Sequence, residues 1–365
     1  VKIKFIMKVC IIGNGLVSLT LAKALINKDI YVDIFYNKSH TKYNQSRTLG
    51  ISKTNIEYFN KYISNIKNIQ WNIKKIKIFT ENFSENEILN FEDQNKDLFS
   101  VILNHQLFNQ LNKELKKSKF FSYKKDIDCE ELLKKNYKLI INCNSNHEIT
   151  KKFFSQKLEK NYNSFAYTTV FKHKKTSNHT AVQIFTKKGP LAFLPISEIK
   201  TSVVYSLRES KHNEEINLAG LIKKFNPKYK IETVDNFTRI ELKSSNLRKY
   251  YNNKILAFGD LLHKLHPLAG QGFNMSIRDV KELIELIDKR IDLGLDIDSS
   301  ICIDFQNRTK SKNYIFSKGV DWIYEFFNFE SKFNNKTLSK SLKLFGSNQS
   351  VNKIFKKIAD IGLYN

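Results

Sequence analysis

Residues 258–274 read FGDLLHKLHPLAGQGFN, and this stretch predicts more about the fold than any other part of the chain. An apolar run ends in Gly259-Asp260, and a loop with Pro267, Gly270 and Gly272 then leads into helical periodicity up to about residue 288. The pattern indicates a strand, a loop and a helix whose unpaired N-terminal N–H groups favour an anion. Asp260 can accept hydrogen bonds from sugar-like hydroxyls. A purely structural strand–turn–helix corner would produce the same pattern, so both interpretations stay open at this point.

The composition indicates a folded and strongly basic protein. The 365 residues are 41% hydrophobic and 13% aromatic, which suits one large or two interlocked globular domains. The formal net charge of +25 favours nucleic acid, anionic lipid or anionic cofactors as partners. Lys, Asn and Ile are abundant throughout the chain, so compositional drift explains the charge equally well. No tight Lys/Arg block indicates a nucleic-acid patch, and we expect no nucleic-acid partner.

Cysteine and histidine spacing predicts neither disulfides nor a metal site. None of the four cysteines is in a CxxC pair, which fits a reducing cytoplasm. His263 and His266 form a close pair, but further ligands at suitable spacing are missing. No stretch of the sequence is apolar over a length that spans a bilayer. We therefore expect a cytoplasmic protein that holds no metal.

The second signal lies near the N-terminus. Residues 8–13 read as a buried strand, residues 13–18 as a GxGxxS turn, residues 19–27 as a helix and residues 30–36 as a second strand. This order is that of a βαβ dinucleotide-binding unit in which Ser18 replaces the third glycine. Gly13 and Gly15 would permit the tight turn and the close approach of a pyrophosphate to the helix N-terminus.

Two nearby positions bear on the ligand of this unit. An acidic residue usually ends the second strand and binds the adenosine ribose, but here the position falls on Tyr36 or Asn37. A phenol or an amide also hydrogen-bonds a hydroxyl, although more weakly than a carboxylate does. Arg47 could clamp a phosphate, and a plain surface arginine is the alternative.

The remaining pattern predicts an α/β protein with an inserted sheet. From residue 165 onward, short strands separated by turn signals indicate an antiparallel sheet inserted as a second domain. The expected strands are 71–80, 87–91, 98–103, 137–142, 165–172, 181–186, 191–195, 202–207 and 231–242, and the expected helices are 54–63, 105–115, 217–225, 280–289 and 301–315.

The C-terminal region, residues 301–365, is predicted to be helical, aromatic and basic. Residues 308–365 contain 11 Lys or Arg against 4 Asp or Glu, a formal charge of +7. A basic, aromatic helical end suits an anionic membrane surface or a hydrophobic partner. Helices packed on the core, with their lysines in solvent, would fit the same residues.

The two motifs together resemble those of the class A flavoprotein aromatic hydroxylases, and within that group the ubiquinone-biosynthesis hydroxylases. The motif of that family reads roughly GDAAHxLHPxAGQGxNLGxRD, and residues 259–279 here read GDLLHKLHPLAGQGFNMSIRD. Residues 46–52, Trp71, residues 189–195 and the aromatic C-terminal region support the resemblance, which covers nearly the whole chain.

The resemblance implies an extended FAD molecule held between the two motifs. Gly13, Gly15 and Ser18 would face the ADP moiety, and Arg47 would lie along the pyrophosphate. Asp260 would hold the ribityl chain. The isoalloxazine would be wrapped by His266, Pro267, Gly270, Gln271, Gly272 and Asn274.

The resemblance also implies a reaction, that of an oxidoreductase of the flavin monooxygenase class. Family members reduce FAD with NAD(P)H, add O2 to form a C4a-hydroperoxide and transfer OH to an electron-rich phenol ring. The backbone N–H groups of Gly270 to Gly272 would stabilise the negative charge of the reduced flavin. Because the cofactor supplies the oxygen chemistry, no protein nucleophile is required. The antiparallel sheet would exclude water, with Phe185, Phe193 and Leu194 pointing inward.

The expected architecture follows from the same resemblance. It is an α/β fold with a Rossmann-like FAD-binding domain, similar to para-hydroxybenzoate hydroxylase, an inserted antiparallel-sheet substrate domain and a helical C-terminal region. The FAD-binding domain would take residues 1–70, 98–160 and 243–300, the substrate domain residues 71–97 and 161–242, and the C-terminal region residues 301–365.

Three functions compete at this stage. The first is hydroxylation of the ring of a polyprenylated phenol or quinol in ubiquinone biosynthesis. This lipid-soluble substrate would bring a cytoplasmic protein to the inner face of the cytoplasmic membrane. Other ubiquinone-biosynthesis proteins would be its partners there. The second is hydroxylation of a soluble small aromatic. The third is a non-catalytic subunit, because the GADG-type motif of many relatives is replaced by NCNSN at residues 142–146. The intact GD-to-GQG segment argues against the third.

Overall fold

A largely parallel sheet forms one half of the protein, which is seen here in a computed structural model that describes residues 7–37, 46–81, 87–92, 97–208, 217–226, 228–266, 270–333 and 360. Strand order reverses between β1 and β9, because β1 pairs in parallel with β2 on one side and with β9 on the other. The order is β16 (Tyr251–Asn252), β17 (Ile255–Ala257), β9 (Leu139–Asn142), β1 (Lys8–Ile12), β2 (Tyr31–Tyr36) and β8 (Phe121–Lys125).

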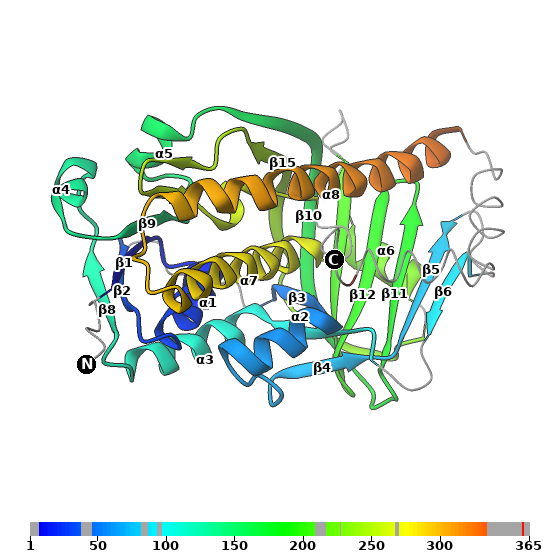
Figure 1. Cartoon of the computed structure of the whole chain (residues 1–365). Coiled ribbons are helices and arrows are strands. Elements are labelled where there is room, and N and C mark those ends of the chain that lie inside the picture. The colour runs from blue at the N-terminus through cyan, green and yellow to red at the C-terminus, as the bar shows by residue number, and fades with distance from the viewer. Residues whose placement is uncertain are drawn as a thin grey trace.

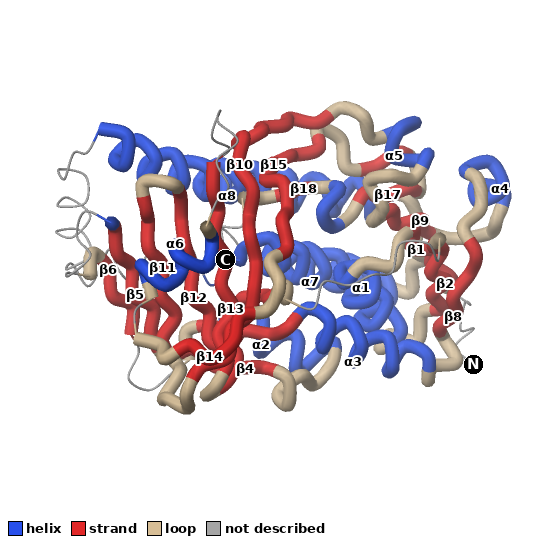
Figure 2. Tube along the Cα trace, turned by 180° about the vertical axis from the view of Figure 1, so that it is seen from behind, coloured by secondary structure: helices blue, strands red, loops and turns tan. Residues whose placement is uncertain are grey.

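Long helices pack against this sheet. α1 (Leu16–Ile26) lies between α3 (Asn104–Lys116) and α7 (Gln271–Asp292), as Figure 2 shows from behind. Residues 9–12 of β1 are fully buried, which explains their continuous apolar run, since parallel strands are covered on both faces. The shorter helices α4 (Cys129–Lys134) and α5 (Glu148–Phe153) flank β9 in the chain.

A larger, mostly antiparallel sheet forms the other half. Nine strands of the described residues belong to it, and one neighbouring pair, β5 and β11, is parallel. The order is β18 (His263–Lys264), β15 (Thr238–Leu247), β10 (Lys157–His173), β13 (Lys200–Arg208), β12 (Gly189–Ser197), β11 (Thr180–Thr186), β5 (Lys75–Thr80) and β6 (Leu89–Glu92), with β14 (Ile231–Val234) paired to β10.

The two faces of the large sheet have different neighbours. α6 (Leu218–Phe225) covers one face, where Phe193 is buried with Phe171 and Tyr229. Leu194 packs on the opposite face, because consecutive residues of a strand point to opposite sides. Phe185 pairs with Pro190 and so shares the face of Leu194. The expectation that all three side chains point toward a cofactor is therefore wrong for Phe193, which lies under α6.

A small sheet and one long helix join the two halves. The small sheet contains β3 (Thr48–Ser52), β7 (Phe99–Leu103) and β4 (Gln70–Ile73). α8 (Ser300–Phe333) crosses the upper part of the molecule in Figure 1, from the six-stranded sheet to the large sheet. α2 (Lys53–Tyr58) follows β3 and continues into a π-helical turn, η2 (Phe59–Ile63).

Most of the predicted elements are present, with two corrections. The predicted strand 71–80 is two strands in different sheets, because the backbone N–H groups of Lys74 and Lys75 both donate to the carbonyl of His179 and turn the chain. The predicted strand 231–242 is likewise divided into β14 and β15. β8, α4 and α5 lack strong apolar periodicity and were not predicted. Residues 334–359 and 361–365 of the C-terminal region lie outside the described residues, and the predicted domain boundaries stay a prediction.

Candidate active site

The carboxyl ends of three parallel strands meet at one edge of the six-stranded sheet. Ile12, Asn142 and Ala257 are in register, so the loops that follow β1, β9 and β17 are neighbours. A Cβ on Gly13 would lie 3.2 Å from the Cβ of Asn144. A ligand site is expected at this place, where the strand order reverses.

Glycines keep the backbone open at the N-termini of α1 and α7. Gly15 precedes α1 and Gly272 lies in the first turn of α7, and a Cβ on either would meet no heavy atom within 4 Å. Gly13 and Gly270 have φ of +102° and +65°, which other residues rarely adopt. Each of the two sequence motifs therefore leads into a helix N-terminus with room beside its backbone, where an anionic group is stabilised.

The start of α7 is tied to the end of β3 by Asn274. Its side-chain amide donates to the Gly50 carbonyl at 2.8 Å, and its Oδ1 accepts from the Ser52 backbone N–H at 2.9 Å. Asn55 donates to the same oxygen at 2.9 Å. Asn274 is 1% exposed, so this buried network holds Gly50 and Gly270 close together. The residue predicted to wrap the isoalloxazine thus also positions two segments far apart in the sequence.

The other predicted ADP-side residues lie in different surroundings. Ser18 is fully buried in the first turns of α1, beside the Cys143 thiol. Burial raises the pKa of Cys143 to about 12, so the thiol is neutral. Asp260 is exposed in the 3-10 turn η4 (Gly259–Leu261), and Arg47 is exposed just before β3. Asp260 and Arg47 are therefore accessible to a ligand, whereas Ser18 lies within the helix–sheet packing.

Tyrosines occupy the place where an acidic residue usually ends the second strand. Tyr36 packs edge-on against Tyr123, with ring centroids 5.0 Å apart. The Tyr123 hydroxyl lies 3.2 Å from Oδ1 of Asn14 and donates to Asn112 at 2.8 Å. Sequence reasoning missed Tyr123 because β8 is short and its pattern, FSYKK, is weak. The contact with Asn14 brings β8 to the glycine loop.

His266 is buried between two tyrosines from distant elements. Its ring centroid lies 4.8 Å from that of Tyr162 on β10 and 4.1 Å from that of Tyr324 on α8. Neither ring nitrogen has a partner among the described residues. Burial, with a further contribution from Lys160, lowers the pKa of His266 to about 3. The imidazole is therefore neutral, with one donor and one acceptor left for a bound group.

His263 lies close in sequence but has a different role. Its Nε2 lies 2.5 Å from Oδ2 of Asp279, and both side chains are fully buried. Asn313 on α8 donates to the other Asp279 oxygen at 3.0 Å. This chain of contacts joins β18, α7 and α8. His263 is therefore paired with a carboxylate, whereas His266 contacts aromatic rings.

The residues of the two motifs fit FAD. Open space at Gly15 and Gly272, and buried polar atoms of His266 and Gln271 without partners among the described residues, are the features that a bound cofactor would fill and satisfy. Asp260 would accept ribityl hydroxyls there. Pro267, also predicted to face the flavin, lies outside the described residues.

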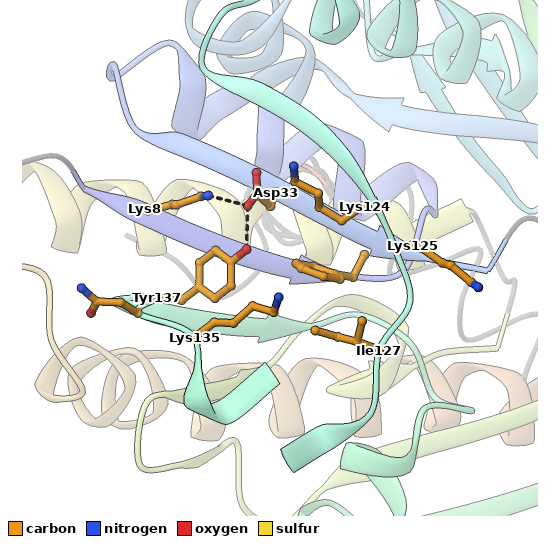
Figure 3. Close-up of a pocket in the computed structure, with 9 residues that line it drawn as sticks. Lys8, Asp33, Lys124, Lys125, Ile127, Lys135 and Tyr137 are labelled. Carbon is orange, nitrogen blue, oxygen red and sulfur yellow. Dashed lines mark hydrogen bonds and ion pairs between the residues drawn. The ribbon is translucent and has the colours of Figure 1, made fainter. Parts of the chain in front are cut away.

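A separate cavity of about 490 Å³ lies beside β1, β2 and β8. Asp33 at its side accepts from Tyr137 and Ser122, each at 2.6 Å, and pairs with Lys8 at 2.7 Å, as Figure 3 shows for Lys8 and Tyr137. Burial alone would raise the pKa of Asp33, but these three partners together lower it. The cavity contains none of the predicted site residues, and its only carboxylate among the described lining residues is already satisfied.

Comparison with known proteins adds independent findings. A family model described as FAD binding domain matches residues 141–291. The chain is 30% identical to 3-demethoxyubiquinol 3-hydroxylase of Escherichia coli over 149 residues, 39% of this chain and 38% of that protein. It is 26% identical to a ubiquinone hydroxylase of Rhodospirillum rubrum over 154 residues, 37% of this chain and 33% of that protein. The chain spans less than half of the length of the curated relatives it matches.

Solved structures match over nearly the whole chain. A p-nitrophenol 4-monooxygenase from Pseudomonas putida has a TM-score of 0.77 at 12% identity, with 98% of each chain covered. A Klebsiella pneumoniae protein, HpxO, complexed with FAD and uric acid, has a TM-score of 0.76 at 10% identity, again with 98% of each covered. At this level of identity the likeness concerns the fold.

The fold and the site define the class: this is an FAD-binding α/β protein with the para-hydroxybenzoate hydroxylase-like architecture. Within the class, the chain is similar to the class A FAD-dependent hydroxylases, including those of ubiquinone biosynthesis. The predicted fold class is thereby confirmed, and the comparisons support the predicted resemblance to this family.

Proposed function

We propose that this protein is an FAD-dependent monooxygenase that hydroxylates the aromatic ring of a polyprenylated phenol or quinol in ubiquinone biosynthesis, with NAD(P)H and O2 as co-substrates. The observation that supports this most is that glycines leave room at the N-termini of two helices, at Gly15 before α1 and at Gly272 in the first turn of α7. Bound FAD would supply the redox and oxygen chemistry.

The protein's own residues would bind and orient the cofactor and would exclude water from the site. The N–H groups at the start of α7 would stabilise negative charge at the pyrimidine side of the flavin. His266, neutral and clamped by Tyr162 and Tyr324, would offer one fixed hydrogen bond without adding charge. The large sheet would close the site on the side of Phe185 and Leu194 and keep water away from the reacting atoms.

The outer face of α8 supports a membrane-bound substrate. Trp322 is 72% exposed and Ile315 is 59% exposed, and their spacing of seven residues puts them on one face of the helix. Lys312 and Lys318 are on the same helix. Exposed tryptophan beside lysines suits the headgroup region of an anionic membrane. Among the described residues, no helix is long and apolar enough to cross a bilayer, so we propose peripheral contact at this face.

The test begins with the flavin. The purified protein is expected to show the yellow visible spectrum of bound FAD, and Asp260→Ala is expected to lower FAD affinity about tenfold because a ribityl hydroxyl loses its acceptor. Asp304→Ala, an exposed carboxylate on α8, is the matched control and should retain FAD. A colourless protein that cannot be loaded with FAD would refute the enzyme assignment, and unchanged FAD affinity in Asp260→Ala would refute the role of Asp260.

The substrate is tested in cells. Expression in bacterial strains that each lack one ring hydroxylase of ubiquinone biosynthesis is expected to restore ubiquinone in one of them. Restoration would identify the hydroxylated position. A protein that binds FAD and oxidises NAD(P)H but rescues none of the strains would instead favour a soluble aromatic substrate.

A further inference from the structure

The start of α2 lacks the cap that its own sequence offers. Ser52 is at the N-cap position and is a residue type that normally caps, but its side chain makes no capping hydrogen bond. The Ser52 hydroxyl donates instead to the backbone carbonyl of Asp360 at 2.9 Å. The cap of α2 therefore comes from the far end of the chain.

Asp360 supplies that cap with its carboxylate. Oδ1 accepts from the backbone N–H of Thr54 at 2.9 Å, and Oδ2 accepts from the Thr54 hydroxyl at 2.6 Å. A carboxylate in this position satisfies a free N–H group of the first turn and interacts favourably with the helix dipole. Both carboxylate oxygens are thus used on one residue of α2.

The same residue also contacts α7. The Asp360 carbonyl accepts from Nη2 of Arg278 at 3.0 Å, and the Arg278 guanidinium lies 4.9 Å from the ring centroid of Phe316 on α8. Arg278 is 5% exposed. Asp360 thereby joins α2 to α7, and through Arg278 to the packing of α8.

These contacts converge on the backbone that would cradle the flavin. Ser52 donates its hydroxyl to the Asp360 carbonyl and its backbone N–H to Oδ1 of Asn274. The Asn274 amide in turn donates to the Gly50 carbonyl. A Cβ on Gly270 would lie 3.3 Å from the Gly50 nitrogen, so small shifts of β3 change the space at the start of α7. The spacing between these segments depends on what anchors α2.

We propose that Asp360 is a positioning residue for the cofactor site: it fastens α2 and α7 together and so sets the distance between Gly50 and the Gly270 loop. Asp360 does not touch the site itself and acts through Thr54, Ser52 and Asn274. This inference rests on the proposed FAD-dependent function, because FAD binding is one of its two measures.

The experiment is a double-mutant cycle on the full-length protein with Asp360→Asn and Thr54→Val. FAD affinity, the visible flavin spectrum and the urea midpoint of the apoprotein are measured for each variant. Each single substitution is expected to raise the FAD dissociation constant about tenfold and to shift the flavin absorbance, and the double variant should lose no more than either single. Asp360→Glu should restore much of the loss, because it returns a carboxylate.

Glu57→Gln is the matched control. It removes one negative charge from α2, the helix that Asp360 caps, but Glu57 is largely exposed and lies 3.9 Å from Lys53. Its FAD dissociation constant should change less than about twofold. Equal effects of Asp360→Asn and Glu57→Gln, or additive losses in the double variant, would overturn the proposal.

Two further outcomes separate this inference from the proposed function. If no variant binds FAD but the urea midpoints still show non-additive coupling of Asp360 and Thr54, the proposed function fails, the contact stands, and the positioning role toward FAD is overturned. If the wild type binds FAD and the coupling is absent, the proposed function stands and Asp360 has no positioning role.

Discussion

At the scale of single residues, Gly270 shows why the loop before α7 requires glycine. Its φ of +65° lies in the left-handed region, and the space that a Cβ would enter is bounded by the backbone of Gly50. Gly294, after α7, has a similar φ of +69° but open space around it. Comparing alanine substitutions at Gly270 and Gly294 therefore separates the effect of a strained backbone conformation from the effect of crowding at the site.

Gly270→Ala and Gly294→Ala are expected to differ in one measurement only. Each should lower the free energy of unfolding by about 1 kcal/mol, because alanine is strained at positive φ. Gly270→Ala should also weaken FAD binding about tenfold, since its Cβ pushes on Gly50. Urea unfolding and flavin titration measure the two effects. Equal FAD affinity of both variants would contradict the crowding at Gly270.

His266 makes stability depend on pH at the residue scale. Its pKa is about 3 in the folded protein, against 6.5 in its ordinary state. Below pH 6.5 the unfolded chain binds a proton that the folded chain does not, so stability falls as pH drops toward 3, by about 1.4 kcal/mol per unit in the steepest part. Above pH 6.5 this contribution is constant.

The pH prediction is checked by urea unfolding of the wild type and of His266→Phe between pH 5 and 8. The variant keeps an aromatic ring between Tyr162 and Tyr324 but cannot titrate. Its stability should fall less steeply than that of the wild type below pH 6.5. Parallel curves for the two proteins would show that His266 is protonated in the folded state as readily as in the unfolded one.

At the scale of elements, the buried pair of His263 and Asp279 joins β18, α7 and α8. Neither side chain is exposed to solvent, and Asn313 completes the network. Removing one partner of a buried pair leaves the other without compensation, which is strongly destabilising. The loop that carries the predicted flavin contacts begins directly after β18, so this network also holds one end of the loop.

Asp279→Asn is expected to lower the free energy of unfolding by about 3–5 kcal/mol. Asp288→Asn on the same helix breaks a pair with Lys28 whose side chains are both about one third exposed, and it should cost less than about 1 kcal/mol. Urea denaturation of both variants is the measurement. Similar costs in the two variants would mean that the buried network adds nothing beyond a surface ion pair.

At the scale of the whole molecule, a net charge of +25 and an exposed apolar face on α8 act together. Long-range attraction would bring the protein to an anionic bilayer, and Trp322 and Ile315 would then enter the interface. The electrostatic attraction to the bilayer is weakened by salt, whereas the apolar contact is not. Membrane binding should therefore need both.

Trp322→Ser is expected to weaken binding to vesicles of phosphatidylcholine with about one third phosphatidylglycerol by about tenfold or more. Leu293→Ser, at an equally exposed leucine after α7, is the control and should bind as the wild type does. Co-sedimentation measures the affinity, and a blue shift of Trp322 fluorescence in a Trp71→Phe background reports its insertion. Equal binding of both serine variants would exclude α8 as the contact face.

The sequence by itself determined the two local strand–loop–helix segments of this protein. The GxGxxS turn at residues 13–18 and the GD-to-GQG stretch at residues 259–272 predicted a strand, loop and helix in each case, and the structure contains both. These signals are readable because a glycine at positive φ and an apolar strand are local requirements. The family resemblance of the same residues was sufficient to predict the fold class.

Only the tertiary structure decided which distant residues meet. Three contacts join residues far apart in the chain. They are the packing of His266 between Tyr162 and Tyr324, the contact of Tyr123 with Asn14, and the cap that Asp360 gives to α2. Which face of the large sheet Phe193 and Leu194 each occupy was likewise decided by the elements that pack on its two sides. Such contacts depend on strand order and helix packing, which a one-dimensional pattern of apolar and polar residues does not encode.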